Sequence, residues 1–153
     1  MKKISLFVFI CLFFACKKEK NENLSELKTN KIKWGQWNLN DYSYTFGISC
    51  FCRYEVTLPR QIQVEEESVV SVNGEPYNTD IHWGVLTISD LFDRVEQAQQ
   101  SNAFVVEVEY HKERGYPIEI YIDENEMIAD EEIGYSVYNL GDWGQLSHLT
   151  EAH

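Results

Sequence analysis

The sequence predicts an α+β fold, with a mostly antiparallel sheet of about five to six strands and one main amphipathic helix. Several short segments alternate apolar with polar residues, which is the pattern of half-buried strands. One central segment instead spaces its apolar residues along one face of an α-helix. Because the alternating strands keep a polar face, an antiparallel sheet is favoured over a parallel sheet buried on both sides.

The longest alternation runs from Tyr42 to Leu58, where every even position is apolar, aromatic or cysteine. At about 3.3 Å per residue, a straight strand of this length would exceed the width of so small a domain. We therefore expect a bend or bulge near Gly47. Pro59 ends this pattern. Two shorter strands follow, at Ile62 with Val64 and at Val69–Val72.

Thr87 begins the predicted helix as its N-cap, and Asp90 lies three residues on, as in a capping box. The helix is expected to end near Gln100. Its apolar face consists of Ile88, Leu91, Phe92, Val95 and Ala98. Trp34 and Trp37, at helical spacing, also fit a short N-terminal helix. Alternation resumes after the main helix, at Phe104–Tyr110, Ile118–Ile122 and Ile133–Val137.

Length and composition bound the function. A chain of 153 residues with 44% apolar and 14% aromatic residues can fill the core of one domain, which excludes a disordered or fibrous protein. The net charge of −12 argues against nucleic-acid binding, which needs clustered Lys and Arg. We therefore expect no nucleic-acid partner.

The N-terminus has the pattern of an export signal. Lys2 and Lys3 precede the uncharged run Ile4–Phe14, which is too short to span a bilayer and fits the apolar region of a signal peptide. The run ends in Phe13-Phe14-Ala15-Cys16, which resembles a bacterial lipobox, with Phe13 where Leu is usual. The resemblance implies a signal peptide at residues 1–15 and a lipidated Cys16 that anchors the protein in the cell envelope, facing the periplasm or in the outer membrane.

The segment after Cys16 is read as a flexible charged tether over residues 16–31, followed by a single domain over 32–153. Residues 17–31 hold five Lys and three Glu, a net charge of +2. Residues 32–153 hold six basic and 22 acidic side chains, a net charge of −16. A basic tether suits the lipid surface, whereas the body is repelled by anionic lipid.

Cys50-Phe51-Cys52 is the first candidate for chemistry. Cys11 leaves with the signal and Cys16 carries lipid, so these two cysteines have only each other as an intrachain partner. In a regular strand their Cα atoms lie about 6.6 Å apart, near the upper limit for a disulfide. Two buried thiols, a structural disulfide, and a redox or metal site all stay open.

The acidic stretch at residues 123–132 is the second candidate. Carboxylates are the hard oxygen ligands that calcium prefers, and the candidate ligands in this stretch are Asp123, Asp130, Glu131 and Glu132. The stretch departs from an EF-hand loop, because Ile128 and Gly134 occupy the positions that require Gly and Glu. A solvated turn between two strands explains it better than calcium. No catalytic constellation is recognised, there being no nucleophile elbow and no phosphate-binding glycine loop.

The ordered landmarks resemble the bacterial domain of unknown function 6174, which occurs in small secreted and lipoprotein-like chains. The resemblance covers about residues 37–140 and rests on the following motifs: Tyr42-x-Tyr44, Cys50-x-Cys52, Val69–Glu75, the helix led by Thr87, Gly115-Tyr116-Pro117, Ile122-Asp123, and Asp130–Ile133 with Tyr135-x-Val137. It implies no catalytic residue and no cofactor. It does imply that Cys50 and Cys52 belong to the architecture of the domain, which favours a disulfide.

These observations predict a membrane-anchored extracytoplasmic lipoprotein that serves as a non-catalytic binding or accessory module. Its expected partners are the lipid bilayer, through Cys16, and a protein or small ligand that the sequence does not identify. The alternatives are a calcium-dependent envelope module using residues 123–132 and a thiol redox protein using Cys50 and Cys52.

Overall fold

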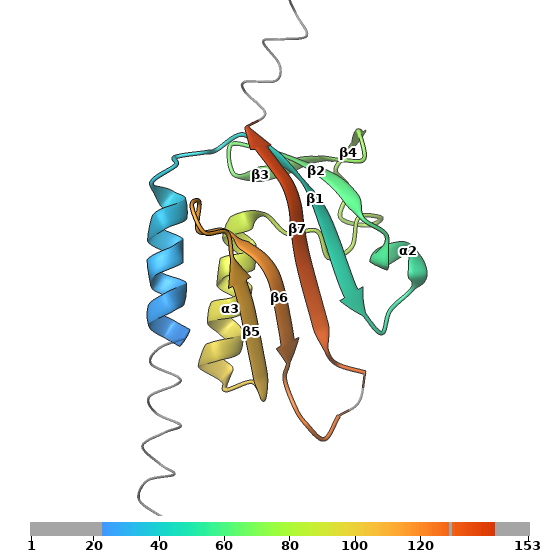
Figure 1. The fold of residues 1–153 in the computed structure, drawn as a ribbon. Helices are drawn as coiled ribbons and strands as arrows, with labels where there is room; N and C mark the ends of the chain where they lie inside the picture. The colour runs from blue at the N-terminus through green and yellow to red at the C-terminus, as the bar shows by residue number, and fades with distance from the viewer. Residues whose placement is uncertain (1–22, 129, 143–153) are drawn as a thin grey trace, which may run out of the picture.

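The computed structural model describes residues 23–128 and 130–142. Within them, seven strands form one antiparallel sheet in the order β4-β3-β2-β1-β7-β6-β5 (Figure 1). The strands are β1 (Tyr42–Cys50), β2 (Arg60–Glu65), β3 (Ser68–Val72), β4 (Glu75–Pro76), β5 (Val105–Tyr110), β6 (Pro117–Asp123) and β7 (Ile133–Asp142). The expected signal peptide, Cys16 and residues 143–153 lie outside the described residues.

The predicted α+β class and the antiparallel sheet are confirmed, and the strand count is seven where five to six were expected. The additional strand is β4, which has only two residues. It pairs with β3, where Pro76 lies opposite Ser71 and Glu75 lies opposite Val72. So short a strand leaves no alternation to detect. The acidic stretch joins β6 to β7, as the turn prediction required.

Strand β1 ends earlier than the alternation predicts. It stops at Cys50, whose sulfur is bonded to that of Cys52, and the helix α2 (Tyr54–Thr57) follows. The single strand expected up to Leu58 is therefore wrong beyond Cys50. The bend expected near Gly47 is also misplaced, because the register of β1 against β7 shifts between Ser43 and Thr45.

The main helix is close to the prediction. Helix α3 (Ile88–Ser101) has Thr87 as its N-cap, with both hydrogen bonds of the capping box to Asp90. Its predicted apolar face is its buried face: Ile88, Leu91, Phe92, Val95 and Ala98. Asn102 ends the helix in the left-handed conformation, which Asn tolerates better than most residues.

A helix at residues 23–35 corrects the predicted tether. Leu27 is 3% exposed and Trp34 is 8% exposed, so this helix belongs to the core. The prediction of a flexible tether up to residue 31 is therefore wrong for residues 23–31, and the domain begins before residue 32. No helix among the described residues combines the length and apolar character needed to cross a bilayer.

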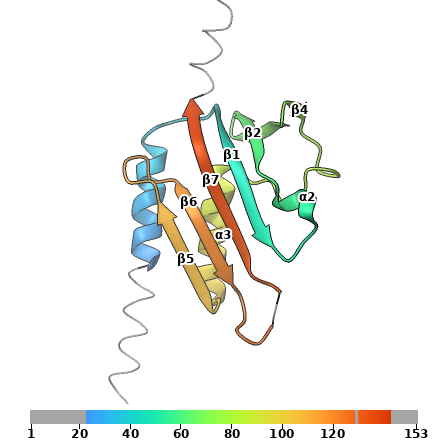
Figure 2. The same cartoon turned by 45° about the vertical axis from the view of Figure 1, so that its right-hand side comes forward.

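The domain has two layers. In Figures 1 and 2 the helix at residues 23–35 and α3 lie on the same side of the sheet, with the core between them and the strands. The even-numbered side chains of β1, Tyr42 to Ile48, face this core and are buried. In both views no helix of the described residues covers the opposite face of the sheet, called here the open face.

Candidate functional site

Strand β5 forms one edge of the sheet, and no described residue pairs with its outer side. The helix at residues 23–35 runs beside this edge (Figures 1 and 2). Between them lies a groove of about 710 Å³, which we call the β5 groove. It is lined by Ser25, Glu26, Thr29, Asn30 and Lys33 from the helix and by Val108–Lys112 from β5 and the turn after it.

The β5 groove continues along the strand. A second hollow of about 330 Å³ shares Glu26, Val108 and Tyr110 with the first and extends to Asn23, Gln99, Val106 and Glu107. The two hollows together follow β5 from Val106 to Tyr110 and continue along the turn after it to Lys112. The two hollows therefore extend along nearly the whole length of β5.

Core packing holds the helix in this position. The Trp34 ring meets the Tyr42 and Tyr116 rings edge to face, with centroids 5.6 and 5.8 Å apart. Lys31 Nζ lies 2.8 Å from Asp93 Oδ1 of α3, an exposed ion pair that contributes little to stability. At the turn after β5, Lys33 Nζ donates to the carbonyl of Lys112 at 3.1 Å. The wall of the groove is thus fixed mainly by buried aromatic contacts.

The helix wall of the groove is polar, and it includes the short side chains of Thr29 and Asn30. Thr29 Oγ1 donates to the carbonyl of Ser25, and Asn30 Nδ2 donates to the carbonyl of Glu26, so both hydrogen-bond within their own helix. Gln99 Oε1, in the second hollow, is buried and has no hydrogen-bond partner among the described residues.

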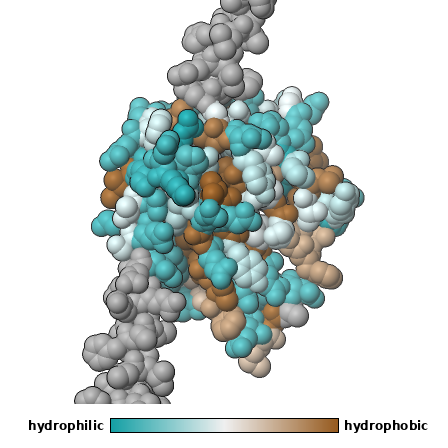
Figure 3. All heavy atoms as spheres, in the orientation of Figure 1, coloured by the Kyte–Doolittle hydropathy of each residue, from teal (hydrophilic) through white to brown (hydrophobic). Residues whose placement is uncertain are grey.

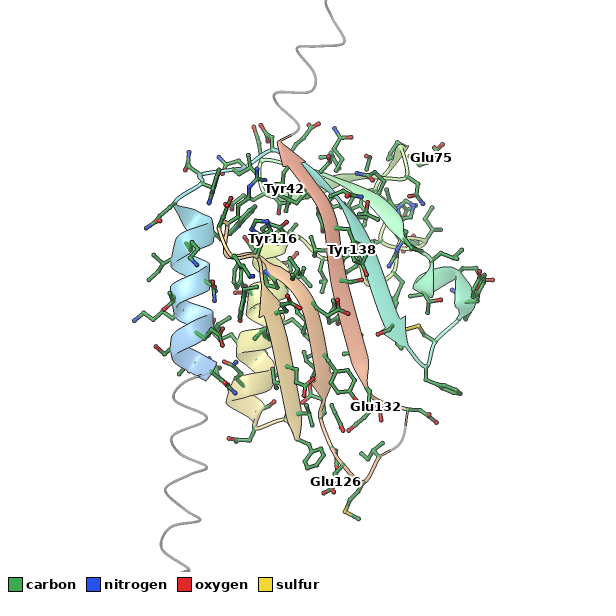
Figure 4. All side chains as sticks on the ribbon, in the orientation of Figure 1. Tyr42, Glu75, Tyr116, Glu126, Glu132 and Tyr138 are labelled. Carbon is green, nitrogen blue, oxygen red and sulfur yellow. A yellow bond between two sulfur atoms is a disulfide. The ribbon has the colours of Figure 1, made fainter. Side chains whose placement is uncertain are left out.

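The open face beside the groove is acidic, whereas the groove itself is lined by two Glu, Glu26 and Glu109, and two Lys, Lys33 and Lys112. Burial, with the nearby Glu26 carboxylate, raises the pKa of Tyr110. On the open face, Glu107 pairs with Tyr121 and Glu109 with Glu119 across β5 and β6. Desolvation and the carboxylates of Glu132, Asp123 and Glu107 raise the pKa of Tyr121. Glu132 lies at the β7 end of this acidic region (Figure 4).

The surface around the helix is mainly hydrophilic in the space-filling view, with separate hydrophobic residues between the polar ones (Figure 3). The β5 groove is therefore a polar site with an apolar floor made by Val106 and Val108 of β5. Such a floor beside an unpaired backbone edge is chemically suited to an extended polypeptide.

The predicted cysteine site lies elsewhere, at the far end of β1. Cys50 and Cys52 form a disulfide with their Cα atoms 5.3 Å apart, closer than in a regular strand, because the chain bends there. Phe51 between them is 81% exposed. The structure brings Cys50 and Cys52 together as a close pair, whereas their oxidation state in the isolated protein and any redox activity stay predictions.

The predicted calcium residues are not brought together as a site. Asp123 Oδ1 accepts from the backbone N–H of Asn125, and the neighbouring Glu124 pairs with Arg94 at 3.1 Å. Among the described residues, no three Asp, Glu, His or Cys side chains are grouped as metal ligands would be. The calcium hypothesis therefore remains a prediction, tested by calorimetry with millimolar calcium.

A family comparison agrees with this architecture. Residues 26–142 match the model of a family of unknown function, DUF6174. The chain belongs to this family. The DUF6174 match begins within the helix at residues 23–35, eleven residues before the expected start at residue 37, and thus includes most of the groove wall. No curated protein and no solved structure matches the chain.

The β5 groove itself could not be predicted from the sequence. Its β5 residues were predicted as a strand, but their place at the sheet edge depends on the strand order. The helix that forms the groove wall lies largely within residues 16–31, whose charged composition indicated a flexible tether. Leu27 and Trp34, seven residues apart, were the available signal, because residues at that spacing share one face of a helix.

Proposed function

We propose that this DUF6174 protein is a lipid-anchored extracytoplasmic module of the cell envelope that binds a partner through the β5 groove. The role is binding or accessory and not catalytic. The anchor is supported by the signal-like run that ends at Ala15-Cys16. The observation that supports binding is the groove itself, which lies along an unpaired strand edge of the described residues.

The early start of the domain shortens the tether. Six residues, 17–22, separate Cys16 from Asn23, where the helix begins. The chain reaches at most about 3.6 Å per residue, so Asn23 lies within about 25 Å of a lipidated Cys16. Because Asn23 and Glu26 line the groove, the proposed binding site is held close to the membrane.

Substitution of the anchoring cysteine tests the first half of the proposal. Two or three acyl chains hold a protein stably on a bilayer, and Cys16→Ser removes their attachment point. Membrane fractionation should find wild type, and the Cys50→Ser/Cys52→Ser control, in the lipid fraction, labelled by a palmitate analogue. Cys16→Ser should be unlabelled and lost from that fraction. A labelled or equally retained Cys16→Ser variant contradicts lipidation.

Cross-linking in intact cells tests the second half. A photoreactive residue at Thr29 lies in the groove, whereas one at Glu75 lies on β4 at the opposite edge of the sheet. We expect one defined adduct from position 29 and none of the same mass from position 75. The same adduct from both positions, or from position 75 alone, contradicts binding in the groove.

A further inference from the structure

The two edges of the sheet differ in how they are protected. One edge ends in β4, which has two residues and contains Pro76. The other is β5, with six residues, no proline, and a register shift only at its end, between Glu109 and Tyr110. Short strands, prolines and bulges normally prevent an edge from pairing with another chain. The main part of β5 has none of these features.

The β5 groove has the form that an added strand requires. Every second residue of an edge strand turns its N–H and C=O away from the sheet, and a new strand lies about 4.8 Å farther out. Beside β5, that space is the groove of about 710 Å³. The helix wall there includes the short side chains of Ser25 and Thr29. Every second side chain of an added strand would point towards the helix wall. The side chains between them would lie on the open face, next to those of β5.

The charges on β5 indicate which kind of polypeptide segment could pair with its outer edge. Glu107 and Glu109 are exposed on the open face of β5, where they would lie beside the outward side chains of an added strand. Opposite charges directly across a strand pair are favourable and like charges are unfavourable. Lys33 and Lys112 lie beyond Tyr110, at the turn end of the groove. Basic side chains opposite Glu107 and Glu109 would therefore find acidic partners.

The same residues disfavour a second copy of this chain. Suppose that the β5 strands of two copies pair antiparallel, so that the two sheets join and their open faces lie on the same side. Each open-face residue of one β5 then lies opposite an open-face residue of the other. Registers that pair most of the strand then place Glu107 opposite Glu107 or opposite Glu109. Such a dimer would bring four carboxylates together, beside the Glu109 and Glu119 carboxylates that already lie opposite each other, so a basic segment is favoured over a second copy.

We infer that the outer edge of β5 takes up an extended polypeptide segment as an additional strand, with Lys or Arg at every second position facing Glu107 and Glu109. The small or apolar residues between them fill the groove against Ser25 and Thr29. This inference rests on the proposed function and names the chemistry of the partner that it binds.

The test uses the full-length protein in detergent and a synthetic peptide that alternates lysine with valine. Calorimetry measures affinity, and hydrogen exchange locates the bound peptide. We expect slower exchange of β5 amides, and binding weakened about tenfold or more by Glu107→Lys/Glu109→Lys. The matched control Glu67→Lys/Glu75→Lys changes the net charge equally at exposed positions outside β5. It should weaken binding much less.

Two further peptides separate strand addition from simple charge attraction. One carries glutamate in place of lysine and should not bind. The other is methylated on alternate backbone nitrogens, prepared in both registers, so that one version cannot hydrogen-bond to β5. The peptide whose methyl groups block the hydrogen bonds to β5 should not bind, and the peptide methylated in the other register should bind as the unmethylated peptide does. Binding by both versions, equal loss in the two charge variants, or protection of β3 instead of β5 would overturn strand addition. Membrane retention through Cys16 does not depend on β5, so that result alone leaves the proposed anchoring intact.

Discussion

Gly115, in the turn between β5 and β6, lies so close to the helix at residues 23–35 that a β-carbon on it would meet the carbonyl oxygen of Asn30 at 2.6 Å. Its φ of +79° is one that residues with side chains rarely adopt. The glycine thus allows the turn to press against the helix backbone. The residues that it contacts, Asn30 and Lys33, both line the β5 groove.

Gly115→Ala should therefore destabilise the protein and separate the turn from the helix. The left-handed backbone alone costs about 1–2 kcal/mol for alanine, and the contact with Asn30 adds to it because backbone atoms cannot give way easily. Urea unfolding measures the loss. Gly35→Ala is the matched control, since a β-carbon there meets nothing within 4 Å. Equal stabilities for the two variants would contradict this role of Gly115.

Local signals predicted much of the fold. The capping box of Thr87 and Asp90 lies within four consecutive residues, and its hydrogen bonds hold wherever the helix packs. The Asn73-Gly74 turn has positive φ at both residues, which these two residue types accept. Such elements are predictable because their energetics are settled by neighbours in the sequence.

The rest depended on distant contacts. Beyond Cys50 the alternation continues through Tyr54, but the disulfide bends the chain and Tyr54 is 73% exposed on α2. The helix at residues 23–35 is helical because Leu27 and Trp34 reach a core built by later strands. The groove exists only once β5 is the last strand of the sheet. None of these facts follows from residues that are close in sequence.

The protein should lose stability in alkali. Burial raises the pKa of Tyr42 from 10.0 to about 12, and the pKa values of Tyr44 and Tyr110 shift in the same direction. A pKa that is higher in the folded state favours folding fully below pH 10, and that contribution is lost as pH rises towards 12. For Tyr42 the loss amounts to about 2–3 kcal/mol.

Urea unfolding at about pH 8 and about pH 11 measures this effect. Tyr42→Phe should show a smaller decrease between the two pH values, although it is less stable at both because it leaves the Ile88 amide without its acceptor. Tyr138→Phe, at a position 48% exposed, serves as the control and should behave as wild type. A stability that is unchanged or greater at the higher pH would contradict the prediction.

The cysteine pair should be oxidised in protein isolated without reductant. Trypsin cuts after Lys33 and Arg53 and releases residues 34–53, which contain Cys50 and Cys52 and no other cysteine. Mass spectrometry should find this peptide two hydrogens lighter than the dithiol and unreactive to alkylation until it is reduced. Full alkylation without reductant would show two thiols instead.

Reduction of that disulfide should leave the protein folded. The bond joins residues only two apart in the sequence, so it restricts the unfolded chain little, and its loss should cost at most about 1–2 kcal/mol. Unfolding curves of wild type with and without reductant, compared with that of Cys50→Ser/Cys52→Ser, measure this. A variant that no longer unfolds cooperatively would show that the bend at the end of β1 depends on the bond.

Of the two leucines in the helix at residues 23–35, Leu27 should contribute far more to stability than Leu24. Leu27 is 3% exposed and packs in the core, whereas Leu24, one turn earlier, is 44% exposed. Leu27→Ala should cost about 2–4 kcal/mol, because it removes buried methyl groups and leaves a cavity. Leu24→Ala should cost less than about 1 kcal/mol. Urea unfolding compares the two, and hydrogen exchange should show the helix opening first in Leu27→Ala. Equal costs for the two leucines would mean that residues 23–31 behave as the tether that their charge suggested.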